Sequence, residues 1–263
     1  IEQIEFPAKL NHINSYAFEE CKNLKLAGFP QNSEIYLIDN GAFQSSGIKK
    51  IEIPSNAVLI GNYAFENCQN LEVFEFKPNS KLIFIGIYAF QSSSITKIEI
   101  PSSVRQIGSY AFNKCEKLQI VKFDPNSCLE YIEENIFNSC IQLETIEIPS
   151  KVSCIGKNSF ENCKKLKAIS ISKDSELRII EESSFKDSSL KELIIPPSVK
   201  RICESSFQNC PIESIVFMDN SKLEVIGKKA FYSCKIKDII IPPSVQIIDD
   251  EAFFCSPLYS VSI

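Results

Sequence analysis

One eighteen-residue phrase recurs along this chain, and its recurrence limits the possible folds more than any other feature. IEIPSSVRQIGSYAFNKC occupies residues 98–115, and closely similar phrases occupy residues 51–68 and 146–163. A catalytic motif is normally needed once. Repetition at a fixed period is instead typical of a solenoid, in which one unit cannot bury its own apolar face and must stack on a copy of itself. The sequence therefore predicts a solenoid.

A phenylalanine marks each repeating unit. The eleven markers are Phe18, Phe43, Phe65, Phe90, Phe112, Phe137, Phe160, Phe185, Phe207, Phe231 and Phe253. Shorter and longer intervals of 22 to 25 residues alternate between them, so the period is a pair of units. The added residues fall in one turn, which is a Pro-Ser phrase in short units and a wider Asn-Ser phrase in long units, as at residues 77–82. We expect a single array over residues 1–263.

Each unit also carries a strand pattern. In Leu-x-x-Ile-x-Ile, as at Leu143, Ile146 and Ile148, the last two apolar residues alternate with outward positions. Proline follows in most units and must end the strand there, because it removes a backbone donor. The next phrase, Val-x-x-Ile-Gly-x-x-Ala-Phe, supplies a second inward row. About twelve strand phrases are readable, and the last of them ends at Ile263.

The recurring phrase I-x-I-P-x-S-V-x-x-I-G-x-x-A-F-x-x-C resembles the leucine-rich repeat of the BspA type, over essentially all 263 residues. The resemblance implies a right-handed superhelix with one long parallel β-sheet of about twelve short strands. The other side would consist of short strands, turns and short helical turns. Some units depart from the pattern, since Asp39 and Glu133 stand where others have Gly61 or Gly86, so a left-handed backbone is not obligatory there.

Composition argues against two kinds of contact, with nucleic acid and with the interior of a membrane. A net charge of −5 without a basic stripe argues against nucleic acid. The longest apolar run, around residues 82–90, is far shorter than the roughly 18 residues that a membrane helix needs. The chain opens inside one strand phrase and closes inside another, so we expect an excerpt of a longer array, truncated within units at both ends.

The eleven cysteines follow the repeat. Seven stand three residues after a marker phenylalanine, where other units have serine: Cys21, Cys68, Cys115, Cys140, Cys163, Cys210 and Cys234. A position shared by Cys and Ser favours a small, weakly polar side chain, so we expect a ladder of buried thiols. The odd total argues against an obligatory disulfide framework, and the lack of Cys-x-x-Cys argues against zinc. No cofactor is expected.

Candidate catalytic residues are scarce. His12 is the only histidine, and we expect it to face solvent. No Gly-rich phosphate loop is present. A carbohydrate-cleaving enzyme would need carboxylates that converge in one groove, which a row of Glu52, Glu75 and Glu99 could imitate. Acidic residues in repeat register instead indicate a repeated surface, so we expect no enzymatic activity.

The outward positions of the strands supply the candidate binding residues. The first half of the chain carries an acidic stripe beside two lysines: Glu52, Glu75, Glu99, Glu147, Lys50 and Lys97. The second half carries an apolar row of Ile194, Val216 and Ile240. We interpret the row as a partner-binding patch and the stripe as a surface for a basic partner. A covering loop, or a simple preference for β-branched residues in strands, would also explain the row.

The family resemblance implies a function. Proteins similar to this one are found mainly in bacteria and parasitic protozoa, often at the cell surface or secreted, where they attach to host cells, extracellular matrix or other microbes. We therefore expect an adhesive protein-binding module at a cell surface. The alternative is an intracellular scaffold, which the missing Asn-x-Ser/Thr sequon and the unpaired cysteines mildly favour.

Overall fold

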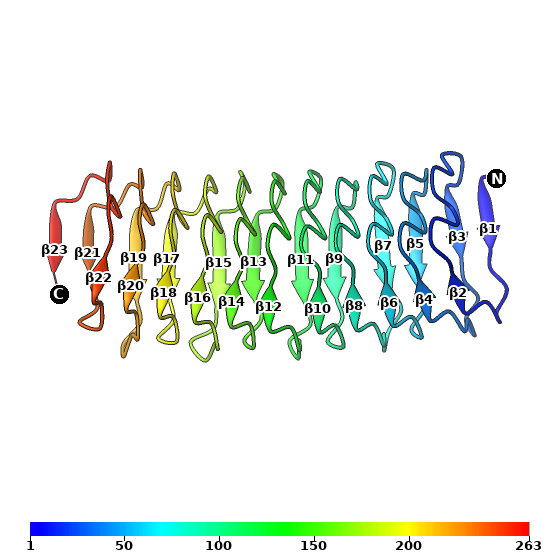
Figure 1. Cartoon of the computed structure of the whole chain (residues 1–263), viewed down its shortest axis with the longest axis horizontal. Coiled ribbons are helices and arrows are strands. Elements are labelled where there is room, and N and C mark those ends of the chain that lie inside the picture. The colour runs from blue at the N-terminus through cyan, green and yellow to red at the C-terminus, as the bar shows by residue number, and fades with distance from the viewer. Residues whose placement is uncertain (263) are drawn as a thin grey trace. The chain divides into compact units, whose positions relative to one another are not determined.

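The computed structural model describes residues 1–262 and divides the chain into two compact units, Ile1–Cys128 and Leu129–Ile263. Ile263, which closes the last predicted strand phrase, lies outside the described residues. In each unit all strands are parallel to their partners and form two rows, one of odd-numbered and one of even-numbered strands (Figure 1). Each unit is thus a solenoid, as predicted. That all repeats form a single array stays a prediction.

Unit 1 carries the longer strands in its odd-numbered row. They are β1 (Gln3–Glu5), β3 (Leu26–Gly28), β5 (Lys50–Ile53), β7 (Val73–Phe76), β9 (Lys97–Ile100) and β11 (Ile120–Phe123). The even-numbered strands have two residues each and form one ladder. They are β2 (His12–Ile13), β4 (Leu37–Ile38), β6 (Leu59–Ile60), β8 (Phe84–Ile85) and β10 (Gln106–Ile107).

Unit 2 repeats this arrangement. Its odd-numbered strands are β13 (Thr145–Ile148), β15 (Ala168–Ile171), β17 (Glu192–Ile195), β19 (Ser214–Phe217), β21 (Asp238–Ile240) and β23 (Ser260–Ser262). Its even-numbered strands are β12 (Tyr131–Ile132), β14 (Cys154–Ile155), β16 (Ile179–Ile180), β18 (Arg201–Ile202), β20 (Val225–Ile226) and β22 (Ile247–Ile248). We call one odd-numbered strand, the following even-numbered strand and the marker phenylalanine one coil.

The odd-numbered strands do not form one uninterrupted sheet. Four-residue registers join β5 to β7 and β9 to β11 in unit 1, and β13 to β15 and β17 to β19 in unit 2. β7 and β9 are neighbours but belong to different sheets. The N–H of Lys77 donates to the carbonyl of Ile53 at 2.9 Å, whereas Pro101 occupies the equivalent place after β9 and has no N–H, so one hydrogen bond of this kind is missing between β7 and β9.

The marker phenylalanines form the core of each unit. Their rings stack on those of the adjacent coils, with centroids 5.1–5.3 Å apart from Phe18 to Phe112 and 5.0–5.4 Å apart from Phe137 to Phe253. Within these series Phe43 to Phe231 are fully buried. The inward strand residues and the leucines before the strands pack around them, as the alternating pattern predicts.

A third row of hydrogen bonds runs through the segment around each marker phenylalanine. In the coil of Phe65, the N–H groups of Tyr63, Phe65 and Asn67 donate to carbonyls of the next coil at 2.7–2.9 Å. The residues in between donate within their own coil, to the carbonyl three residues earlier. We call this segment the turn row, and its hydrogen bonds link one coil to the next.

The predicted short helical turns are wrong, because residues 1–262 contain no helix. Two residues before and two residues after each marker, the backbone is left-handed, as at Tyr63 (φ 59°) and Asn67 (φ 54°). A helix needs consecutive right-handed residues, so these two positions prevent it. The residues there are mostly Asn, Ser or Tyr rather than Gly, a signal too weak to identify from sequence.

The left-handed positions provide a stability test. Lys114 has a φ of 56° and is exposed. Lys114→Gly is expected to raise the free energy of unfolding by about 0.5–1 kcal/mol, because glycine adopts this conformation without a steric cost. Lys114→Val should lower it by about 1–2 kcal/mol, because a β-branched residue fits this region worst. Urea unfolding measures both, and equal stabilities of the two variants would contradict the assignment.

The glycines that follow the core isoleucines have a different role. A side chain at Gly86 would place its Cβ 2.4 Å from the backbone nitrogen of Asn62, so glycine is needed for close approach of the preceding coil. Its φ is not in the left-handed region, which agrees with the prediction that such a backbone is not obligatory there.

The cysteine ladder is confirmed as buried thiols. None of the eleven cysteines forms a disulfide, and those of the ladder are buried except for half-buried Cys21. The thiol of Cys115 donates to the carbonyl of Phe90 at 3.0 Å, and the thiol of Cys210 donates to that of Phe185 at 3.0 Å. Ser256 uses its hydroxyl in the same way, on Phe231. Cys and Ser can share this position because either side chain can donate to the marker carbonyl of the preceding coil. Three other ladder serines, Ser46, Ser93 and Ser188, lie 3.2–3.5 Å from the thiol of the following coil.

Candidate functional site

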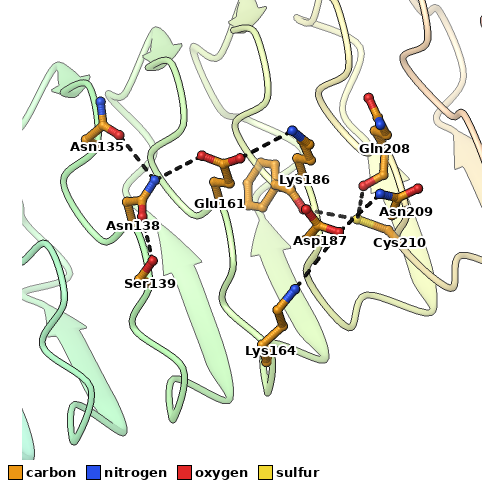
Figure 2. A network of polar contacts seen from close by, with 11 residues as sticks. Asn135, Asn138, Ser139, Glu161, Lys164, Lys186, Asp187, Gln208, Asn209 and Cys210 are labelled. Carbon is orange, nitrogen blue, oxygen red and sulfur yellow. Dashed lines mark hydrogen bonds and ion pairs between the residues drawn. The ribbon is translucent and has the colours of Figure 1, made fainter.

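Polar side chains along the turn row bond to one another between adjacent coils. Few of them are therefore available to bind a ligand. In unit 2 the amide of Asn138 donates to Glu161 at 3.1 Å, and Lys186 lies 3.5 Å from the same carboxylate (Figure 2). In unit 1 Gln44 and Gln91 both donate to Glu66. These carboxylates therefore already have partners in adjacent coils.

The outward face of unit 1 carries the predicted acidic stripe. Glu52 and Glu75 stand directly opposite each other on β5 and β7, and Lys50 stands opposite Val73. On β9 and β11, Glu99 stands opposite Lys122. All six side chains are exposed, as the strand alternation predicts.

A groove of about 750 Å³ lies in this face and contains Glu52, Glu75, Glu99 and Lys97. Its walls include Lys77–Ser80 and Asp124–Pro125, which belong to the two longer turns that follow β7 and β11. Between them the shorter turn of β9 contributes only Pro101 and Ser102. The alternation of turn lengths explains the groove, because a short turn between two long ones leaves a depression.

The charges in the groove are partly neutralised. Lys97 Nζ lies 2.7 Å from Glu99 Oε1 in an exposed ion pair. The hydrogen bond from Lys97 lowers the pKa of Glu99. A glycosidase needs one carboxylic acid whose pKa is raised, so Glu99 is unsuited to that role. This weakens the interpretation of Glu52, Glu75 and Glu99 as a carbohydrate-cleaving site.

Unit 2 holds the other predicted residues. Glu147 is exposed on β13, opposite Ser170, and is not part of the groove. Ile194 and Val216 stand opposite each other on β17 and β19, and β21 with Ile240 lies next to β19. Their side chains are 50%, 51% and 70% exposed, so within the described residues nothing covers this apolar row.

A second apolar surface in unit 1 was not predicted. Leu37, Leu59 and Phe84 point outward in register on β4, β6 and β8 and are half-buried. Tyr36 and Ile83, next to them in the chain, are exposed. Their outward position could have indicated this surface from sequence. The strands there have only two residues, however, which is too few to show an alternating pattern.

Reactive groups are few outside these surfaces. His12 is exposed on β2 and its ring hydrogen-bonds to Asn11. Burial, and then the nearby Glu181 charge, raise the pKa of Cys154 to about 12, so this thiol is not a ready nucleophile. Among residues 1–262 no group of three His, Cys, Asp or Glu side chains is placed to hold a metal ion. The described part of the chain also has no helix long and apolar enough to span a membrane.

Comparison with known proteins agrees with the repeat geometry. A family profile described as "BspA type Leucine rich repeat region" matches in six copies, over residues 1–119, 83–213 and 178–263. No curated protein sequence matches significantly.

Solved structures show the same fold. A leucine-rich repeat protein from Bacteroides ovatus shares 22% identity with a TM-score of 0.68, over 99% of this chain and 80% of that one. The pneumococcal vaccine antigen PcpA shares 21% identity with a TM-score of 0.55, over 100% and 79%. A leucine rich cell surface protein from Faecalibacterium prausnitzii shares 22% identity with a TM-score of 0.50, over 100% and 82%.

Proposed function

Because the chain belongs to the family of BspA-type leucine-rich repeats, we propose that it is a non-enzymatic protein-binding module whose outward strand face contacts the partner. The observation that carries the proposal is the apolar row of Ile194, Val216 and Ile240 on that face. Contiguous apolar area in solvent is typical of an interaction site, because its burial against a partner is favourable.

Charged residues on the outward strand positions of each unit contribute to association. They are Lys50, Glu52, Glu75, Lys97 and Glu99 in unit 1 and Glu147 in unit 2. Exposed charges mainly raise the association rate of an oppositely charged partner, and salt weakens that effect. The apolar row thus supplies affinity, and the charges supply steering.

We place the protein at a cell surface or in secreted form, where it attaches to host cells, extracellular matrix or other microbes. Support comes from the family and from one structural neighbour, which is described as a leucine rich cell surface protein. Antibodies raised against residues 1–263 test the location on intact and permeabilised source cells. Labelling of intact cells is expected. Labelling only after permeabilisation would favour the alternative, an intracellular scaffold for protein partners.

The apolar row has its own test. Ile194→Glu/Ile240→Glu should lower binding to purified extracellular matrix proteins or host cells at least tenfold, because each charge would be buried in the interface. Folding should be retained, since both side chains are already half or more exposed. Biolayer interferometry measures the binding, and thermal unfolding measures the fold.

The matched control adds the same two negative charges but removes no apolar side chain. Ser170→Glu/Ser214→Glu places two glutamates on exposed positions of the same face of unit 2. This variant should change binding by much less than tenfold, because it adds charge beside the row without removing apolar contact area. Unchanged binding by Ile194→Glu/Ile240→Glu would argue against the row as the contact surface.

A further inference from the structure

We propose that the groove of unit 1 binds an extended segment of a protein partner, with an arginine or lysine of that segment placed over Glu52 and Glu75. The inference rests on the proposed protein-binding function and specifies what the charged part of the face recognises. Its argument comes from the shape, the charges and the apolar contacts of the groove.

The shape of the groove suits an extended chain. It follows β7 and β9 from Glu72 and Thr96 at one end to Asn79 and Ser102 at the other. Seven residues of extended chain, as from Glu72 to Pro78, span about 23 Å. The two longer turns close the far end on both sides, so the segment would lie along the strands rather than across them.

The charges of the groove select a basic side chain. Glu52 and Glu75 stand directly opposite each other, which is unfavourable for two like charges on adjacent strands. Among the described residues neither of them forms an ion pair, and the nearby Lys97 is engaged by Glu99. A guanidinium carries five N–H donors and can bond both carboxylates at once, so arginine should be preferred to lysine.

Apolar side chains lie on either side of this carboxylate pair. Val73 is exposed two residues before Glu75, and Pro101 is half-buried beyond it. In an extended segment alternate side chains face the same way, about 6.6–6.8 Å apart. The segment expected here therefore has a basic residue with an apolar residue two positions away on each side.

A divalent cation is a poorer occupant. Calcium takes six to eight oxygen ligands and is held by several carboxylate or carbonyl groups. The groove offers the Glu52 and Glu75 pair, and in residues 1–262 no third His, Cys, Asp or Glu is placed to complete a metal site.

Selection from a displayed library of short random peptides, on the immobilised full chain at physiological ionic strength, tests the proposal. Enriched peptides should contain the apolar-x-basic-x-apolar pattern. Synthetic copies should bind Glu52→Gln/Glu75→Gln at least tenfold more weakly, because two charge-assisted hydrogen bonds are lost. The variant should unfold at the same temperature or higher, since the like-charge pair is removed.

A charge swap and a matched control make the test specific. Peptides with glutamate in place of the basic residue should bind Glu52→Lys/Glu75→Lys and not the unmodified protein. Glu192→Gln/Asp238→Asn changes the net charge equally on the face of unit 2 and should leave binding unchanged. This control excludes a general attraction of basic peptides to an acidic protein.

The opposite results would overturn the proposal. In the selection, they are the absence of enriched peptides, or the enrichment of peptides that lack a basic residue. In the binding assays, they are unchanged peptide binding to Glu52→Gln/Glu75→Gln, or binding of calcium that requires the two glutamates when calcium chloride alone is titrated. If the peptide experiments overturn the groove proposal while Ile194→Glu/Ile240→Glu still weakens partner binding, the protein-binding function stands. If the groove proposal is overturned and Ile194→Glu/Ile240→Glu also leaves partner binding unchanged, the proposed protein-binding function is wrong.

Discussion

Replacing Phe185 with alanine is expected to lower the free energy of unfolding of unit 2 by about 3–5 kcal/mol. The ring is fully buried and stacks between Phe160 and Phe207, at centroid distances of 5.0 and 5.3 Å. The rings on either side are held by stacking on the rings beyond them, so we expect the gap to stay open and the cavity to add to the lost burial. Urea unfolding followed by circular dichroism measures the loss.

Phe253→Ala is the matched control. It removes the same side chain at the same repeat position, but this ring is only half-buried and stacks on Phe231 alone among the markers. Its loss should be less than half of that at Phe185, because a coil in a linear stack is stabilised by each neighbour. Equal losses would show that the phenylalanine ladder is not the main source of coil-to-coil stability.

Alkaline pH is expected to unfold the protein through the buried thiols. Burial raises the pKa of Cys115, Cys163 and Cys210 to about 12 and that of Cys68 to about 11, from an ordinary value of 9.0. The unfolded thiols therefore ionise first. The stability is fully present below pH 9 and is lost as the pH rises from 9 towards 11–12, by about 1.4 kcal/mol per pH unit for each thiol.

Each unit contains two of these four thiols, which together account for a loss of about 3 kcal/mol per pH unit in each unit, and Cys154, Cys203 and Cys234, whose pKa values burial also raises, add to the loss in unit 2. Urea unfolding at pH 8, 9, 10 and 11 measures it. The control replaces Cys68, Cys115, Cys163 and Cys210 with serine, the residue that other coils use there. Serine can donate to the phenylalanine carbonyl as Ser256 does, and the variant removes the titration of these four thiols, so its stability should fall less steeply. The same slope in both proteins would exclude the thiols as the cause.

Much of the fold could be predicted because the same residue pattern recurs in every repeat. The strands, the phenylalanine core and the thiol ladder follow from residue types at fixed spacing, as at Phe112 and Cys115. The turn row could not be predicted, because its left-handed residues are ordinary ones such as Tyr63 and Lys114, and their conformation is imposed by hydrogen bonds to the next coil. The separation of β7 and β9 into different sheets was not predicted either, because the residue pattern of the two strands is the same as that of paired strands.

The candidate surface was predictable residue by residue but not in its shape. Strand alternation placed Glu52, Glu75 and Ile194 on the outward face, where the structure has them. The groove depends on how far turns of different length project beside one another, which a single-chain pattern does not specify. Glu147 belongs to the same row of the pattern and yet lies outside the groove.

The turn row also makes each unit electrically polar along its stacking direction. The N–H groups of Phe160, Phe185 and Phe207 all donate to the following coil. The peptide dipoles there, about 3.5 D each, add together, whereas those of the strands largely cancel. The positive end of the sum faces the later coils, the reverse of an α-helix. Acidic side chains are therefore favoured at that end, and Asp249, Asp250 and Glu251 lie there in unit 2.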